Sequence, residues 1–496
     1  MAAKSALTVV LCGLVAAGGA SFNDNGLRGG LSGLRWSGWD GRQSCAALSF
    51  ALPEDEAGVV AEVRRAGAAR ERVKVVGAGH SFSAIALSEG ARYMSLDRMR
   101  AGLRLEREAP RGPPGSPGSG SESWLATVQG GMRLFELNDW LQRNGVALAN
   151  LGATAEQSVA GAIATGTHGT GRELGSLSAA VAGLRLVDGE GRVQVAREGD
   201  DLLEAARVSL GALGVVTEVT LRVRPLFYLR ETTVSVALEQ LLARLPALAA
   251  DNERLQWYVL PFATQANGAP ANATLLLRDE VAEPEGAGCW ARAPPGPAVP
   301  HAPSGGLVTH QCADLSFKAL TDSRAGYASR PLYTEMEMHV PLAAERAVLD
   351  EFLSFLRGGL SAKARASPDL KGLFLGVRYV AADQGWLSPQ YRRPTAVFSV
   401  IVDAGRRTDP GDGALFDECA AALERIAARH GAVPHWGKQN WADAAAIAQA
   451  YPRLPDFALV RKRLDPKGIF LNDYLVKRLG LGLAADRDRD EFLVHV

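Results

Sequence analysis

Cysteine is scarce in this sequence, with five residues among 496. No CxxC pair and no cysteine–histidine cluster has the spacing of zinc ligands, so we expect no metal site. Cys289 and Cys312 flank a stretch rich in proline and glycine, and in an oxidising compartment they could close a loop as a disulfide. Two free, buried thiols explain the sequence at least as well, so both alternatives stay open.

A net charge is also lacking, because 54 lysine and arginine residues balance 54 aspartate and glutamate residues. No global field therefore favours nucleic acid, an anionic membrane or a polyanionic substrate. With 47% hydrophobic and 22% charged residues, the composition is that of a soluble globular protein, and the length suits two or three domains. We expect a small-molecule substrate, no nucleic-acid partner and no obligatory protein partner.

The N-terminus has no apolar run long enough for a comfortable transmembrane helix. Residues 6–17 are apolar, Lys4 precedes them and small residues follow them, which is the pattern of a short secretory signal. We expect residues 1–20 to be a signal peptide and the protein to enter the secretory pathway, where it would be lumenal in the ER, membrane-associated or extracellular. A disordered or organelle-targeting N-terminus is the alternative.

Glycine, by contrast, is abundant, with 54 residues, and it is dense in three segments of the first half of the chain. In the first segment, residues 73–76 predict a strand that runs into Gly77 and Gly79. Successive backbone N–H groups in such a turn bind pyrophosphate without a charged side chain. The segment resembles the dinucleotide fingerprint, but Phe82 stands at the third glycine position. Asp97 lies at the distance of a ribose-binding acid, so this segment alone leaves NAD as an alternative.

The second and third glycine-rich segments favour a large planar ligand. Residues 150–171 are mostly small or hydroxylated, which lets the backbone lie flat against a ring system and donate to phosphate and carbonyl oxygens. Residues 209–217 predict a turn into a strand that could close on an adenine. Helices and strands alternate up to Pro225, where the pattern changes to longer elements. Two stretches rich in proline and glycine are expected to be loop insertions, at residues 106–123 and 283–306.

The amino-acid sequences of these segments resemble those of a known family. GAGHSFSAIA, LGATAEQSVAGAIATGTHGTG and SLGALGVVTEVTL, in this order, resemble the FAD-binding domain of the vanillyl-alcohol-oxidase type. Further on, PHWGK at residues 434–438, with YPRLPDF and LDPKGIFLNDYLVK behind it, resembles the sugar-1,4-lactone oxidases. Bacterial alditol oxidases share HSF and HWGK and are the nearest rival.

The resemblance spans residues 36–479 and implies an α+β fold of two domains. One is a PCMH-type FAD-binding domain, and the other is an α+β cap domain with a large antiparallel sheet that binds the substrate. A C-terminal segment would complete the interface between substrate and FAD. The expected bounds of these three parts are residues 45–225, 226–440 and 441–480.

The resemblance implies FAD as the cofactor, bound covalently through His80. In the family, the histidine of the GxGHS segment bonds to the 8α-methyl group of the flavin, and a neutral imidazole nitrogen suits this chemistry. For an isolated histidine, a capping or loop role is the alternative. The other implied FAD contacts lie in the three glycine-rich segments: Gly77, Ala78, Gly79, Ser81, Gly161, Thr165, Gly166, Thr167, His168, Gly169, Thr170, Gly214 and Val216.

Oxidation of an alcohol by a flavin needs a positioned C–H bond, a group that takes the hydroxyl proton, and positive charge near the reduced ring. The resemblance implies that Arg378, Lys438 and His435 serve these needs. Glu337 and Ser388 are implied to contact the substrate, although a salt bridge of Glu337 is an equal alternative.

Gly376 departs from the family, in which an acid usually stands two residues before the arginine. We expect FAD-dependent oxidation at C2 of an aldono-1,4-lactone (L-gulono-, L-galactono- or D-arabinono-1,4-lactone). Oxygen would be the acceptor, because the flavin segment is rich in small residues, and the products would be ascorbate or an analogue and H2O2. The alternatives are an alditol or carbohydrate oxidase that acts on C1 of an open-chain polyol, and a flavin- or sugar-binding protein without turnover. A nicotinamide dehydrogenase is disfavoured by Phe82.

Overall fold

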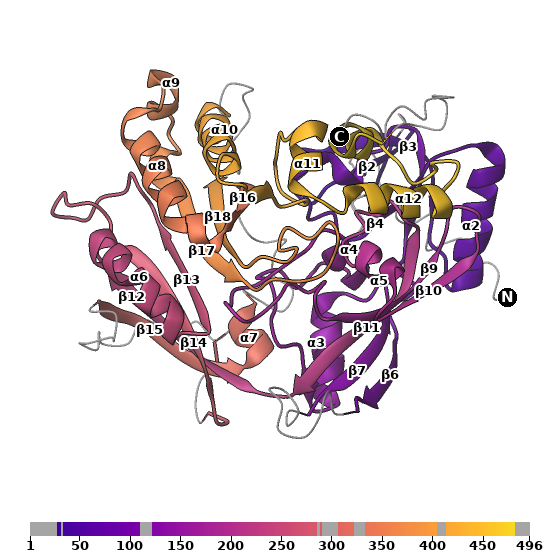
Figure 1. Cartoon of the computed structure of the whole chain (residues 1–496), viewed down its shortest axis with the longest axis horizontal. Coiled ribbons are helices and arrows are strands. Elements are labelled where there is room, and N and C mark those ends of the chain that lie inside the picture. The colour runs from indigo at the N-terminus through magenta and orange to yellow at the C-terminus, as the bar shows by residue number, and fades with distance from the viewer. Residues whose placement is uncertain are drawn as a thin grey trace.

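The fold is seen in a computed structural model. Two lobes meet along a central interface, and the C-terminal helices lie on the first lobe (Figure 1). The expected signal peptide, most of the two predicted insertions and the charged C-terminal tail lie outside the described residues. The structure describes residues 27–30, 33–109, 122–284, 288–289, 306–321, 333–403 and 413–481.

The first lobe begins with a five-stranded sheet in the order β1-β2-β3-β5-β4. Helix α2 (Glu56–Ala69) connects β3 to β4, and β3, β5 and β4 run parallel. The helix begins at residue 56 because the Asp55 side chain accepts a hydrogen bond from Gly58 N at 2.8 Å. The chain leaves the carboxyl end of β4 directly into the glycine-rich loop. The strands are β1 (Leu27–Gly30), β2 (Gly33–Ser37), β3 (Ser44–Ala51), β4 (Val73–Val76) and β5 (Ala91–Ser95).

An antiparallel sheet in the order β10-β9-β11-β7-β6, with β8 paired to β11, completes the first lobe. Leu137 and Leu141 of one helix and Ala162 of another pack with Val219 and Leu221 of β11 in a common hydrophobic core. The strands are β6 (Gly102–Arg107), β7 (Trp124–Gln129), β8 (Val146–Ala147), β9 (Val181–Val187), β10 (Val193–Arg197) and β11 (Val215–Pro225). The helices are η1 (Ala84–Ala86), α3 (Leu134–Arg143), α4 (Val159–Ala164) and α5 (Asp201–Ala206).

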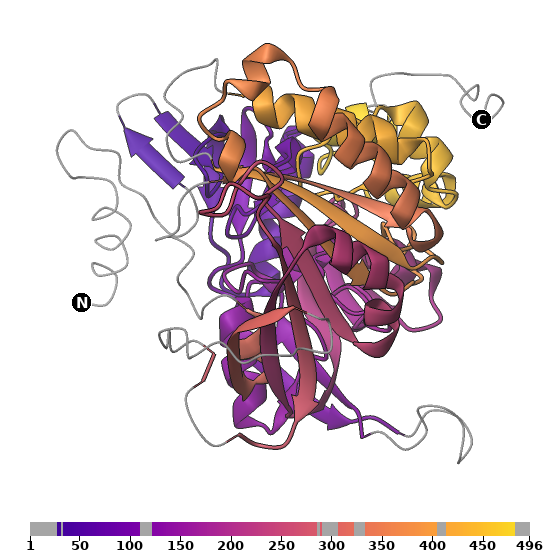
Figure 2. The same cartoon turned by 90° about the vertical axis from the view of Figure 1, so that its left-hand side faces the viewer.

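The second lobe is an eight-stranded antiparallel sheet in the order β15-β12-β14-β13-β17-β18-β16-β19. Its strands are β12 (Tyr228–Val236), β13 (Arg254–Val259), β14 (Ala273–Val281), β15 (Leu307–Leu315), β16 (Tyr333–Pro341), β17 (Phe374–Val380), β18 (Thr395–Asp403) and β19 (Val433–Pro434). Three helices cover one face of this sheet, which is turned toward the viewer in Figure 2: α6 (Leu238–Asp251), α8 (Glu345–Gly358) and α10 (Ala414–Ala428). The shorter helices are α7 (Ser316–Leu320), α9 (Ala362–Arg365), η3 (Leu342–Ala344) and η4 (Leu370–Gly372).

Strand alternation gives this sheet two different faces. Met336 and Met338 of β16 and Val377 of β17 point into the hydrophobic core beneath the helices. Their neighbours in the strands therefore point to the other face, which is directed at the first lobe. The residues of that face in β16 are Glu335, Glu337 and His339, all buried although polar. The sheet thus presents a row of charged and polar side chains at the interface between the lobes.

The C-terminal segment returns to the first lobe as three helices, α11 (Ala444–Ala450), α12 (Leu454–Leu464) and α13 (Asp473–Leu479), drawn in yellow in Figure 1. The Asn472 side chain donates to Ile85 O at 2.9 Å and to Leu87 O at 2.7 Å. Phe82 N donates to Gly437 O at 2.7 Å, and Ser83 Oγ donates to Trp436 O at 2.6 Å. The last quarter of the chain therefore holds the loop that follows β4.

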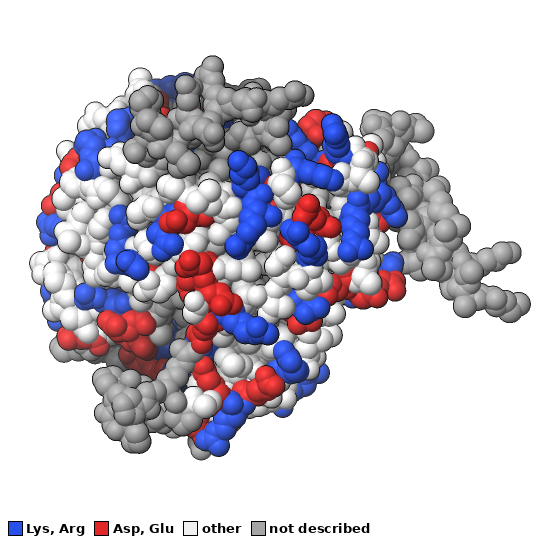
Figure 3. Space-filling view, turned by 45° about the vertical axis from the view of Figure 1, so that its right-hand side comes forward, with Lys and Arg blue, Asp and Glu red and all other residues white. Residues whose placement is uncertain are grey.

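Cys289 and Cys312 form a disulfide, which settles the alternative that the sequence left open. Cys45 and Cys419 are buried free thiols. Among the described residues, no helix combines the length and the apolar character that a membrane crossing requires. Lysine and arginine are interspersed with aspartate and glutamate over the face drawn in Figure 3.

Candidate active site between the two lobes

The loop at residues 77–81 approaches other parts of the backbone closely. Gly79 has a φ of +72°, in the region that favours glycine, and a Cβ there would lie 3.2 Å from Trp39 N. A Cβ on Gly77 would lie 2.3 Å from Ser158 Oγ, which caps helix α4 by accepting from Gly161 N. The sequence Gly-Ala-Gly therefore lets the end of β4 and the start of α4 meet.

Around this meeting point lies a cavity that we call the glycine-lined cavity. It is bounded by the end of β4, its loop, the start of α4 and the turn before β11. Its lining includes the following residues: Trp36, Lys74, Gly77, Ala78, Gly79, His80, Ser81, Gln157, Ser158, Gly161, Thr165, Leu210 and Gly211. Backbone N–H groups of a glycine loop and a capped helix start are the donors that bind a phosphate.

Buried donors at this cavity lack acceptors. Arg133 Nη2 pairs with Asp97 Oδ1 at 2.6 Å, but Nη1 is buried, has no hydrogen-bond partner among the described residues, and lies 3.9 Å from the Cβ position of Gly77. Burial lowers the pKa of the Lys74 ammonium to about 8. Trp36 Nε1 is also buried, and no described residue accepts a hydrogen bond from it. Since buried donors are normally satisfied, these groups fit an anionic dinucleotide that supplies the acceptors. Asp97 forms an ion pair with Arg133, so nothing marks it as an acid that binds a ribose.

A second cavity, the inter-lobe pocket, adjoins the first. His80, Ser81, Gln157 and Thr165 line both cavities, so His80 stands at their junction. The rest of its lining comes from both lobes: Phe82, Gly152, Ala153, Thr154, Thr167, His168, Tyr333, Glu335, Glu337, Arg378, His435, Gly437 and Lys438. The pocket therefore brings together four residues predicted from the sequence: Arg378, Lys438, His435 and Glu337. Glu337 and Lys438 stand more than 100 positions apart in the chain.

Two carboxylates of β16 lie in the inter-lobe pocket. Glu335 forms an ion pair with Lys438, and its side chain is 3% exposed. Glu337 accepts from Ser399 Oγ at 2.9 Å through Oε1, which also lies 3.7 Å from Arg378 Nη1. Two carboxylates and two cations thus lie together in the pocket, and their four charges sum to zero.

The environments of the two acids separate their pKa values. Burial raises the pKa of Glu335, the Lys438 ammonium opposes that shift, and the charge of Glu337 adds to it. Burial acts on Glu337 too, but Lys438, His168 and Arg378 outweigh it and hold the pKa of Glu337 well below its usual range. Glu337 is therefore the fixed anion of the pair, and Glu335 is the carboxylate that exchanges a proton more readily.

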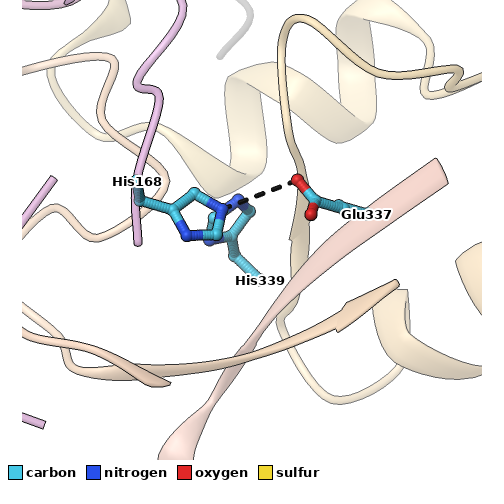
Figure 4. Close-up of side chains that lie close together, drawn as sticks. All are labelled: His168, Glu337 and His339. Atoms are coloured by element: carbon cyan, nitrogen blue, oxygen red, sulfur yellow. Dashed lines mark ion pairs between the residues drawn. The ribbon is translucent and has the colours of Figure 1, made fainter. Parts of the chain in front are cut away.

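Three histidines lie close to Glu337, and two of them, His168 and His435, also line the pocket. His168 Nδ1 donates to Gly169 O at 2.9 Å, and its Nε2 lies 3.5 Å from Glu337 Oε2 (Figure 4). His435 Nδ1 accepts from Gly437 N at 2.9 Å, and burial lowers the pKa of His435 to about 3. The ring of His339 lies 5.1 Å from that of His168 and 5.7 Å from that of His435, centre to centre. His435 is therefore neutral, with its proton on Nε2.

His168, Glu337 and His339 each offer one ligand atom, and these atoms lie within 4.8 Å of one another (Figure 4). Such a set of nitrogen and oxygen donors can hold a divalent metal. The charges of Arg378 and Lys438 act on the same carboxylate and oppose a further cation. The expectation of no metal site stays a prediction.

Gly376 leaves no room for the missing acid in the present packing. A Cβ on Gly376 would lie 2.7 Å from Phe374 Cε1, and the Phe374 ring stacks on Tyr258 with 4.7 Å between centres. Gly376 pairs with Ser399 of β18, which in turn pairs with Glu337 of β16. The carboxylates of this pocket thus come from β16, two strands away from the position at which the family carries its acid.

Some residues implied by the resemblance lie outside both cavities. The Thr170 hydroxyl donates to Leu255 O and accepts from Tyr379 N at 3.1 Å, so it joins the lobes. A Cβ on Gly214 would lie 2.4 Å from Val187 O, which makes Gly214 a close contact between strands. Ser388 Oγ donates to Asp383 Oδ2 at 2.7 Å, and Ser388 is not part of the lining of either cavity. The other such residues are Gly166, Gly169 and Val216, whereas Gly161 and Thr167 line one cavity each.

The sequence did not single out several residues of the site. Glu335 could have been found, because it stands two residues before Glu337 and strand alternation puts both on one face. Gln157 lies within the glycine-rich segment and lines both cavities. Lys74 and Arg133 carry no signal in the sequence, because a charged residue in a strand or at a helix start is usually solvated.

A cavity suited to an anionic dinucleotide, joined to a pocket of paired acids and cations, defines the class of the protein. It is a two-lobe oxidoreductase that works with a bound dinucleotide. The comparisons with known proteins supply the cofactor and the family.

Two family models match the chain. The model described as an FAD binding domain matches residues 47–197, and the model described as D-arabinono-1,4-lactone oxidase matches residues 308–478. L-gulono-1,4-lactone dehydrogenase of Mycobacterium tuberculosis is 34% identical over 464 residues, which cover 90% of this chain and 99% of the relative. L-gulonolactone oxidase of Mus musculus is 27% identical, with coverage of 90% and 99%. Alditol oxidase of a Streptomyces species is 29% identical, with coverage of 84% and 94%.

Among solved structures, cholesterol oxidase from B. sterolicum matches with a TM-score of 0.68. The match covers 90% of this chain and 96% of that chain at 15% identity, so it speaks for the fold alone. The chain belongs to the sugar-1,4-lactone oxidase family, within the vanillyl-alcohol-oxidase type of FAD-linked enzymes. The predicted fold class, FAD as cofactor and an FAD-dependent oxidoreductase are thereby confirmed, and the nicotinamide alternative is wrong.

Proposed function

We propose that the protein oxidises an aldono-1,4-lactone at C2, with oxygen as the acceptor, to ascorbate or an analogue and H2O2. The observation that carries the proposal is the inter-lobe pocket, where His80 adjoins the Lys438–Glu335 pair and the Arg378–Glu337 pair. A lactone of this kind is neutral and rich in hydroxyl groups. A pocket of two cations and two carboxylates offers it donors and acceptors without an excess of charge.

FAD would lie along the glycine-lined cavity, held by the loop at residues 77–81 and the start of α4, and would accept the two electrons of the oxidation. Arg378 and Lys438 line the inter-lobe pocket and would supply positive charge that stabilises the reduced flavin. Both cations are kept in place by carboxylates, at 3.7 Å for Arg378 Nη1 and Glu337 Oε1. His435, neutral and with its proton on Nε2, can donate a hydrogen bond to a substrate oxygen.

A panel of substrates tests the proposal. Purified protein is mixed anaerobically with gulono-, galactono- and arabinono-1,4-lactone, and with xylitol and sorbitol, while the flavin absorbance is followed. Reduction by a lactone supports the proposal. Reduction by polyols alone would establish the alditol oxidase alternative. This alternative is suggested by the similarity to the Streptomyces relative and by Gly376, which stands where the family carries an acid. Flavin that none of these sugars reduces would point to a binding protein without turnover.

The acceptor needs its own measurement, because the names of the relatives include both a dehydrogenase and oxidases. Gly152 and Ala153 line the pocket with little bulk, which leaves space for dioxygen. We expect the reduced protein to be reoxidised by dissolved oxygen with formation of H2O2. Reoxidation only by an artificial acceptor would make the protein a dehydrogenase.

We also propose that His80 bonds covalently to the flavin. Burial, together with the charges of Arg133 and Lys438, lowers the pKa of His80 to about 3, so a neutral nitrogen is available for bond formation. Trp39 stacks on the imidazole, with 5.4 Å between ring centres, and fixes its orientation. After acid denaturation, the yellow colour is expected to stay with the polypeptide, and to be released in His80→Ala. Release from the wild-type protein would refute the bond while leaving FAD binding intact.

The location of the protein is proposed to be the secretory pathway, with residues 1–20 as the signal peptide. The Cys289–Cys312 disulfide supports this, because such bonds persist in oxidising compartments. Expression with a C-terminal tag, followed by fractionation and N-terminal sequencing, tests it. Recovery of the uncleaved chain in the cytosol would contradict it.

A further inference from the structure

A hydroxyl group can be oxidised in the inter-lobe pocket only if some side chain takes its proton. The histidine, carboxylate and lysine side chains that line the pocket are His80, His168, Glu335, Glu337, His435 and Lys438. Their hydrogen bonds decide which of them has a free lone pair directed at the pocket.

The nitrogen bases of the pocket are poorly placed to accept a proton. His435 Nδ1 is occupied by Gly437 N at 2.9 Å, so the neutral ring carries its proton on Nε2 and acts as a donor. Lys438 is paired with Glu335, which keeps it an ammonium ion without a lone pair. His168 Nδ1 donates to Gly169 O, and its Nε2 faces Glu337 Oε2 at 3.5 Å. His80 is reserved for the flavin in the proposed function.

Glu337 has one hydrogen-bond donor and two basic side chains around its carboxylate. Its Oε1 accepts from Ser399 Oγ at 2.9 Å and lies 3.7 Å from Arg378 Nη1, and its Oε2 faces His168. The side chain is 1% exposed. A carboxylate that is this well solvated by the protein is a weak base.

The hydrogen bonding of Glu335 differs from that of Glu337. Its Oε2 receives the Lys438 ammonium, whereas no hydrogen bond from a described residue reaches its Oε1. The charged groups that face it come from three elements: Glu337 on its own strand, Arg378 on β17, and Lys438 in the loop after β19. This carboxylate therefore combines a free oxygen with a pocket-lining position.

We propose that Glu335 is the group that accepts the hydroxyl proton of the substrate, with Lys438 as the cation that orients it. The O–H bond breaks and its proton moves to Glu335. The C–H bond of the same carbon breaks and its hydrogen passes with both electrons to FAD, while the oxygen keeps an electron pair that completes the C=O bond. This role rests on the proposed function, and it moves the proton acceptor from the HWGK segment to β16.

The pH dependence has a definite sign. Glu335 accepts a proton only when it is ionised, and burial places its pKa above the usual carboxyl range. The rate constant of flavin reduction therefore falls as the pH falls through this raised pKa. Lys438 opposes the shift, so Lys438→Met should move the acid limb of the profile to higher pH.

The experiment is anaerobic stopped-flow reduction of the holoenzyme, with whichever lactone or polyol reduces the wild-type flavin, as a function of pH. Glu335→Gln is expected to slow reduction by about 100-fold or more and to remove the acid limb, since general bases contribute about 10²- to 10⁴-fold. Glu335→Asp keeps a carboxylate and should retain the limb. Glu345→Gln is the matched control, because Glu345 is a carboxyl with a raised pKa that accepts from Tyr379 Oη at 2.6 Å, away from the pocket.

Flavin content and thermal midpoint are recorded for every variant, so that misfolding is recognised. Reduction of Glu335→Gln at the wild-type rate, with its acid limb unchanged, would overturn the role of Glu335 and leave the proposed function standing. A limb that persists in Glu335→Gln but vanishes in Lys438→Met would assign the proton to Lys438 instead. If no sugar reduces the wild-type flavin, the proposed function and this role fall together.

Discussion

Single buried atoms without partners mark the cofactor site at the scale of residues. Arg133 Nη1 and Trp36 Nε1 are two such donors, and both lie beside the loop at residues 77–81. A buried donor without a partner is costly, so a ligand that supplies an acceptor at this loop would stabilise the fold. The most informative residues of this site are therefore ones whose bonding is incomplete in the protein alone.

Arg133→Met is expected to weaken FAD binding by about 10- to 100-fold, because a hydrogen bond from a charged donor contributes about 1.5–3 kcal/mol. The measurement is titration of apoprotein with FAD in the His80→Ala background, where a covalent bond cannot hide the loss. Asp97→Asn is the control, since it removes the negative charge that pairs with Arg133 at 2.6 Å but keeps the guanidinium. Equal FAD affinity in Arg133→Met and the parent would contradict the assignment.

The sequence predicts residues of this site unevenly. Gly77, Gly79 and His80 stand in one motif, and all three line the glycine-lined cavity, with His80 at its junction with the inter-lobe pocket. Glu335 lies outside every motif, and its role depends on the ion pair with Lys438, 103 positions along the chain. Pairings across such separations follow from the packing of strands, which local patterns do not encode.

At the scale of elements, the junction of β4 and α4 depends on the absence of a side chain. Gly77→Ala is expected to displace Ser158 Oγ, which would lie 2.3 Å from the new Cβ, and so to break the cap of α4. The cost is about 1–2 kcal/mol and appears as a lower midpoint of thermal unfolding.

Two further variants control this prediction. Gly372→Ala should leave the midpoint unchanged, because a Cβ there meets nothing within 4 Å. Combining Gly77→Ala with Ser158→Gly should recover most of the loss, because the clash disappears and glycine is a tolerated cap. No recovery in the double variant would place the strain elsewhere.

Elements with a strong periodic pattern were predictable. Residues 73–76 predict a strand, and β4 spans Val73–Val76. The order of strands was not predictable, because β17 pairs with both β13 and β18, and β18 with β16. Those pairings bring Gly376, Ser399 and Glu337 into one row and thereby decide where the acids of the pocket lie.

At the scale of the whole molecule, a few backbone-directed bonds join the lobes. Thr170 reaches Leu255 O and Tyr379 N, and Gly171 N donates to Tyr379 O at 2.7 Å. Since the inter-lobe pocket draws its lining from both lobes, these bonds fix the distance between the flavin loop and β16. The geometry of the reaction therefore depends on residues that touch neither ligand.

Thr170→Val is expected to lower stability by about 1–3 kcal/mol, because it leaves two buried backbone groups without their partner at nearly constant shape. Hydrogen exchange should increase in β13 and β17 next to the interface. Thr127→Val is the comparison, since the hydroxyls of Thr127 and Thr220 lie 2.9 Å apart within the first lobe. That variant should lose stability without faster exchange in β13 and β17. Faster exchange in both variants would contradict a specific role of Thr170 in joining the lobes.

The return of the C-terminal segment to the first lobe sets an order on biosynthesis. The loop that carries His80 is held by Trp436, Gly437 and Asn472, so it has its final supports only after most of the chain has left the ribosome. The FAD-binding lobe is encoded first but completed last. A chain terminated before residue 472 would lack the bonds from Asn472 to Ile85 O and Leu87 O that help to hold this loop.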